Sequence, residues 1–146
     1  MKPYPGIVLG LSLFGLGYFI GAFQRSRSAI TVLLLVAFSI AGWRLSIDVG
    51  YGSGQPLAFT AAGAIGALSV SLGLVLAWPI IRRRYLFVAV VTLGGAVGGL
   101  IFRFINELVS DSFESLWAFL LFVEWQVVFM IGIWVAMKYG KSRGKS

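Results

Sequence analysis

Hydrophobic residues occur along this chain in five long runs, which short polar or basic segments separate. The runs cover residues 5–23, 29–47, 57–80, 85–103 and 116–137. Each is within or near the roughly 20 residues that an α-helix needs to cross the ~30 Å hydrocarbon core of a bilayer. The pattern predicts an all-α fold: a polytopic integral membrane helical bundle of five transmembrane helices, forming one domain over residues 1–137.

The segments between the runs predict the connections. Residues 48–56 contain three glycines and predict a loop, and Pro56 suits the first turn of the helix that follows. Pro79, near the end of the third run, predicts a helix terminus. Residues 104–115 are polar and acidic, with apolar residues spaced as on one face of a short interfacial helix. Residues 138–146 form a basic tail.

Composition agrees with a membrane location. Hydrophobic residues make up 59% of the chain and charged residues only 12%, against about a quarter charged in soluble domains. So few charges could not cover the surface of a water-soluble fold, whereas lipid tails solvate apolar side chains. Cysteine and histidine are absent, which excludes disulfides, thiolate catalysis and the usual zinc and iron–sulfur ligands. We expect no cofactor and no enzymatic activity.

Charge predicts the orientation. The chain carries 12 Lys and Arg against 5 Asp and Glu, and the basic residues lie in short clusters between the apolar runs. This placement is typical of charges that set membrane topology rather than of nucleic-acid binding. Five spans put nine basic residues and no acid on one side of the membrane: Arg25, Arg27, Arg82, Arg83, Arg84, Lys138, Lys141, Arg143 and Lys145. We therefore expect an external N-terminus and a cytoplasmic C-terminus in a cell (inner or plasma) membrane.

Small residues recur at helical spacing within the runs. Glycines four residues apart form a groove in which two helix backbones can approach closely, and in lipid such packing is a main source of helix association. These faces predict packing within the bundle, and also a homo-oligomer or contact with other membrane subunits. The predicted packing glycines are Gly94, Gly95, Gly98 and Gly99 in the fourth run, Gly63 and Gly66 in the third, and Gly6 with Gly10 and Gly17 with Gly21 in the first.

Glu124 is the candidate for chemistry. It lies about eight residues into the fifth run, which places it ~10 Å into the membrane. A carboxylate at such depth is costly and is by default a functional hypothesis. Arg103, at the end of the fourth run, is the expected partner, and Arg44 ends the second run on the same side. The pair predicts either a structural ion pair, a proton or cation site, or a contact with a partner subunit or a lipid headgroup.

The sequence favours a non-catalytic function. Small size, abundant small-residue faces and the lack of catalytic residues indicate a small subunit or an accessory or assembly factor of a membrane complex. The alternative is a small oligomeric ion channel or proton-coupled transporter that uses Glu124 and Arg103. An intramembrane enzyme has less support, since a lone intramembrane carboxylate offers no acid–base pair.

Overall fold

A computed structural model describes residues 4–52 and 57–108, together with residues 123, 127, 130–132, 134 and 135. Throughout these residues the regular structure is helical. The elements, in chain order, are α1 (Tyr4–Phe19), the 3₁₀ turn η1 (Arg25–Arg27), α2 (Ser28–Gly52), α3 (Ala58–Ala77) and α4 (Arg84–Leu108).

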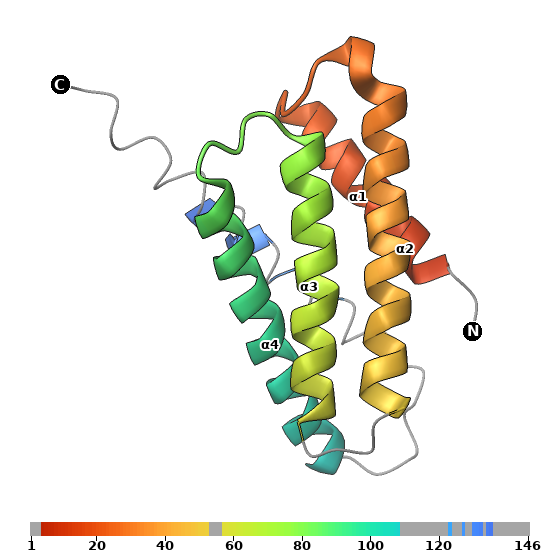
Figure 1. Ribbon diagram of the computed structural model, residues 1–146, viewed down its shortest axis with the longest axis vertical. Helices are drawn as coiled ribbons and strands as arrows, with labels where there is room; N and C mark the ends of the chain where they lie inside the picture. The colour runs from red at the N-terminus through yellow and green to blue at the C-terminus, as the bar shows by residue number, and fades with distance from the viewer. Residues whose placement is uncertain are drawn as a thin grey trace, which may run out of the picture.

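The three long helices lie side by side and alternate in direction, with α3 between α2 and α4 (Figure 1). The helix α1 packs obliquely against α2. Within the described residues, three helical segments are long and apolar enough to cross a membrane: Arg25–Gly52, Ala58–Ala77 and Arg84–Phe104. The helix α1 is also apolar but has only 16 residues, about 24 Å at 1.5 Å per residue. The protein is thus a helical bundle suited to burial in a bilayer.

Two helices extend beyond the predicted boundaries. The helix α2 continues through Asp48 to Gly52, where the glycines predicted a loop. Its last turns pack on α3, because a Cβ on Gly50 would lie 3.4 Å from Ala62 Cβ and 3.6 Å from the Phe59 ring. The helix α4 continues past Arg103 to Leu108. A charged residue marks the end of the apolar run, but it does not end the helix, whose backbone hydrogen bonds are internal.

The first helix is shorter than its apolar run. It ends at Phe19, and a turn leads to η1. The turn contains Gly21 with φ of +65°, a left-handed conformation that residues with a Cβ adopt only at a cost. Ala22 folds back so that its N–H donates to Gly17 O at 2.8 Å. The prediction of a helix through residue 23 is therefore wrong for its last turn.

Most of the fifth run, including residues 116–122, lies outside the described residues. Those described within it are helical. Gly132 is buried, and a Cβ on it would lie 2.8 Å from Val91 Cγ2. This part of the fifth run therefore contacts α4 within about two turns of its start at Arg84.

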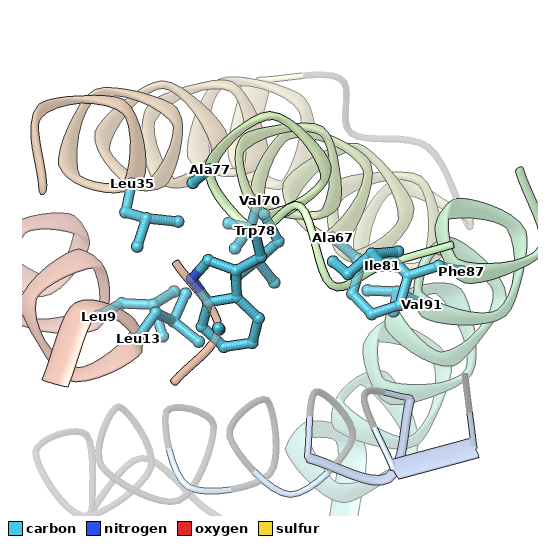
Figure 2. Packing of buried hydrophobic residues seen from close by; sticks show 12 residues of the cluster. Leu9, Leu13, Leu35, Ala67, Val70, Ala77, Trp78, Ile81, Phe87 and Val91 are labelled. Carbon is cyan, nitrogen blue, oxygen red and sulfur yellow. The ribbon is translucent and has the colours of Figure 1, made fainter. Parts of the chain in front are cut away.

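The hydrophobic core lies where α1, α3 and the connection between α3 and α4 meet (Figure 2). Trp78, 1% exposed, occupies its centre. The indole packs against α1, where a Cβ on Gly17 would be 2.7 Å from Trp78 Nε1. Leu9 and Leu13 of α1 flank one side of the ring, and Ile81 lies on the other side of the cluster. Gly17 therefore provides the space that the Trp78 side chain needs, the largest fully buried one among the described residues.

Candidate functional site

The predicted polar pair is only partly within the described residues. Glu124 lies outside them, so its pairing with Arg103 stays a prediction. Arg103 is half-buried near the end of α4, whereas Arg44 is exposed on α2. Because α3 lies between these two helices, Arg44 and Arg103 are on opposite flanks of α3. The structure does not bring the two arginines together.

Three of the predicted packing glycines meet where α3 and α4 touch. A Cβ on Gly95 would clash with Ala67 Cβ and lie 2.5 Å from Gly63 O. A Cβ on Gly63 would clash in turn with Gly95 O, and one on Gly99 would clash with Phe59 O. The two backbones are therefore in direct contact, and no larger residue fits at these positions without a shift of one helix.

The other glycines of α3 and α4 have different surroundings. Gly66 is buried and faces α2, since its carbonyl oxygen lies 3.0 Å from the Cβ position of Gly42. Gly98 is buried and Gly94 is half-buried on α4. The single helix α3 thus uses Gly63 toward α4 and Gly66 toward α2, which the regular spacing of its small residues does not distinguish.

The glycines of α1 also divide. Gly17 makes room for Trp78, as described above. Gly21 lies in the turn after α1, and a Cβ there would meet nothing within 4 Å. It therefore does not form a helical packing pair with Gly17. The backbone contact of α1 with α2 is at the other predicted pair, Gly6 and Gly10, where a Cβ would lie 2.7 Å and 2.6 Å from the Cα atoms of Ile40 and Val36.

Two serines, Ser46 and Ser69, link α2 to α3. Ser46 is the more buried of the two, and the sequence did not single it out. Ser46 Oγ lies 2.7 Å from Gly42 O in its own helix and 2.8 Å from Ala62 O across the interface. Ser69 Oγ on α3 donates to Phe38 O on α2 at 2.9 Å. The buried face of α2 consists of Thr31, Leu35, Ser39, Gly42, Ser46 and Gly50.

These positions recur at steps of three and four residues. The sequence shows that spacing, but serine and threonine occupy these positions as often as glycine does. Glycine pairs alone therefore do not reveal this face of α2. The Ser46 hydroxyl meets backbone carbonyls and can hold two helices together without a second polar side chain, whereas the buried Ser39 hydroxyl has no hydrogen-bond partner among the described residues.

One end of the bundle gathers five arginines. Arg25 and Arg27 belong to η1, and Arg82, Arg83 and Arg84 lead into α4; all five are exposed. Antiparallel packing of α2 and α3 brings the two connections to the same end (Figure 1). We call this surface the arginine end. The guanidinium of Arg25 lies 5.4 Å from the centre of the Tyr18 ring, within the range of a cation–π interaction.

Comparison of the chain with models of protein families, with curated proteins and with solved structures finds no match. The contacts within the bundle and the distribution of its charges therefore carry the information about function. Two features stand out in the described residues: interfaces built from backbone and hydroxyl contacts, and the arginine end.

Proposed function

We propose that this protein is a non-catalytic integral membrane protein, a small subunit or an accessory or assembly factor of a membrane complex. The observation that carries the proposal is the use of polar groups at the contact of α2 and α3. Ser46 and Ser69 donate to backbone carbonyls of the facing helix, so these hydroxyls stabilise the bundle. Polar contacts that join one helix to the next suit a structural role.

The outer surface supports a role in assembly. Large apolar side chains are exposed along α4, including Leu93, Val97 and Phe104, which are 54–67% exposed. The described residues of the fifth run add Met130, Ile131 and Trp134 to the exposed set. Lipid or the apolar face of another membrane helix can cover such side chains equally well, because dispersion contacts rather than hydrophobicity select between them.

Purification from the native membrane tests this function. The full-length chain is tagged at the C-terminus, cross-linked in the membrane and extracted in a mild detergent. We expect a second chain, or further copies of this one, to co-purify above the 15.8 kDa monomer. A lone monomer in every detergent and without cross-links would contradict the proposal. Ion flux in reconstituted liposomes that disappears in Glu124→Gln would also contradict it, in favour of a channel.

We further propose five spans, an external N-terminus and a cytoplasmic arginine end in a cell membrane. The gathering of five arginines at one end supports the orientation under the positive-inside rule. The contact of Gly132 with Val91 supports the fifth span, because it returns the chain toward the end of α4 that begins at Arg84. The basic residues 138–146 would then lie on the same side as the arginine end.

The absence of native cysteine makes the topology directly measurable. Single cysteines are introduced at Ser26, at Tyr51 and at Ser146, and intact cells are treated with a maleimide that cannot cross membranes. Ser26 is exposed at the arginine end, and Tyr51 is 70% exposed at the opposite end of α2. We expect labelling of Tyr51→Cys alone. Labelling of Ser26→Cys would contradict the orientation, and labelling of Ser146→Cys alongside Tyr51→Cys would contradict the odd number of spans.

A further inference from the structure

The arginine end is held together by the hydrophobic core. Ala22, three residues before Arg25, belongs to the same buried cluster as Trp78 and Ile81. Ile81 immediately precedes Arg82, and Phe87 of the same cluster lies in the first turn of α4. The two basic connections are therefore attached to one packed unit, so their arginines stay together despite being more than fifty residues apart in the chain.

Each of these arginine clusters stands at the start of a helix, where the helix dipole is unfavourable for positive charge. Helix N-termini carry a partial positive charge and usually attract acidic residues. Neither α2 nor α4 has an acidic residue in its first turn. The carboxylate residues of these two helices, Asp48 and Glu107, fall near their far ends instead. Each cluster thus adds like charge to a positive helix end.

The residue at the N-cap of α4 adds further positive charge to this helix end. The Phe87 N–H donates to Arg83 O at 2.9 Å, which makes Arg83 the residue that precedes the first turn of α4. Ser, Thr, Asp or Asn usually occupies this position, because their side chains accept hydrogen bonds from the free N–H groups. A guanidinium has donors only.

Exposed aromatic residues border the arginines. Phe19 is 89% exposed at the end of α1, and Tyr85 is 93% exposed beside Arg84. Tyrosine and tryptophan side chains of membrane proteins concentrate at the level of the lipid headgroups. The position of Tyr85 beside Arg84 indicates that the arginines lie at the same level, within reach of phosphate groups and not in bulk water.

We propose that the arginine end binds the phosphate groups of anionic phospholipids in the adjacent leaflet. A bound phosphate supplies the negative charge that both helix starts lack, and its oxygens accept hydrogen bonds from guanidinium groups and free helix N–H groups. This binding site is separate from the proposed role in a complex, because it requires only the bilayer as a partner. The same clusters serve as topology signals during insertion, and the mature protein uses them to bind lipid.

The test uses the full-length protein in detergent micelles, with native mass spectrometry to count bound lipid during titration with phosphatidylglycerol or with phosphatidylcholine. An arginine near an anionic surface contributes about 1 kcal/mol, or about fivefold in affinity. We expect Arg83→Gln to weaken phosphatidylglycerol binding about fivefold and the triple variant of Arg82, Arg83 and Arg84 to weaken it on the order of a hundredfold. The matched control is Arg44→Gln, an exposed arginine on the same bundle outside the arginine end, which should leave binding unchanged.

Three outcomes would overturn the proposal. Equal binding of phosphatidylcholine and phosphatidylglycerol would show that the headgroup charge is not recognised. Equal losses in Arg83→Gln and Arg44→Gln would show that the arginine end is not special. Displacement of phosphatidylglycerol by millimolar inorganic phosphate, at constant ionic strength, would identify free phosphate as the ligand. Circular dichroism of each variant checks that the helices are intact, and the single substitution keeps the test decisive if the triple variant does not fold.

Discussion

Substitution of Gly95 by alanine adds one methyl group where α4 touches the backbone of α3. The new Cβ would clash with Ala67 Cβ and would lie 2.5 Å from Gly63 O, while ordinary van der Waals contact begins at 3.4 Å. Relief of the Gly63 contact alone requires the helices to separate by about 0.9 Å, the difference between these two distances, and the nearer Ala67 Cβ requires more. The obstacle on the Gly63 side is backbone, which cannot move aside by a change of rotamer.

The free-energy change follows from this geometry. Overpacking of a well-packed interface costs about 1–3 kcal/mol. Because separation at Gly95 also loosens the neighbouring contacts of Gly63 and Gly99, we expect a value in the upper part of that range. The matched control is Gly15→Ala on α1, a helical position where a Cβ would meet nothing within 4 Å. Alanine there should be neutral or stabilise by up to about 1 kcal/mol, through helix propensity.

Unfolding of the purified proteins in identical micelles measures the difference. Thermal transitions followed by circular dichroism should place the midpoint of Gly95→Ala about 5–10 °C below that of the unmodified protein, at roughly 2–4 °C per kcal/mol for a chain of this size. Gly15→Ala should match or exceed the unmodified protein. If Gly95→Ala and Gly15→Ala unfold at the same temperature, the close contact of α3 with α4 is not as described and the reasoning fails.

Three further substitutions test other contacts. Ser46→Ala should lower the free energy of unfolding by about 0.6–1.7 kcal/mol, because it removes a hydrogen bond across the α2–α3 interface, whereas Ser12→Ala on the exposed side of α1 should have little effect. Gly21→Ala should cost about 1–2 kcal/mol through its left-handed φ, and Gly21→Asn less. Trp78→Ala should cost about 3–5 kcal/mol. Trp78→Phe should cost about 1 kcal/mol or less, since it removes a buried N–H for which the described residues offer no acceptor.

The same unfolding measurement decides each case. Equal stability of Ser46→Ala and Ser12→Ala would mean that the Ser46 hydroxyl does not link the helices. A Gly21→Ala variant as stable as the unmodified protein would rule out the left-handed turn after α1. If Trp78→Phe were as damaging as Trp78→Ala, the indole N–H would have a partner, and the packing described around Gly17 would need revision.

The existence of the apolar helices could be predicted because it depends on local properties of the chain. A bilayer offers no hydrogen bonds to the backbone, so an apolar run of sufficient length must satisfy its own N–H and C=O groups as a helix. The three described helices that are long and apolar enough to cross a membrane follow from this rule. The boundaries were less predictable, since α2 continues through Gly50, which packs on α3, and α4 continues past Arg103.

The candidate sites depended more on tertiary structure. Gly63, Gly66 and Gly17 have similar sequence surroundings, yet they face α4, α2 and the side chain of Trp78. Glycine carries no side chain that selects a partner, so only the positions of the other helices assign each one its contact. From the sequence, the face of α2 that contains Ser46 could contact lipid or protein, and only the position of α3 in the structure shows that it contacts protein.

The arginines show what the sequence determines and what the tertiary structure determines. The sequence alone determined that Arg25 and Arg27, and Arg82 to Arg84, separate apolar runs and carry no nearby acid. Their assembly on one surface required the antiparallel packing of α2 and α3 and the common core around Trp78. Apolar length and charge order are written along the chain because the membrane acts on each segment separately. Which residues become neighbours is a property of the whole bundle, because each helix face is defined only by the helix that lies against it.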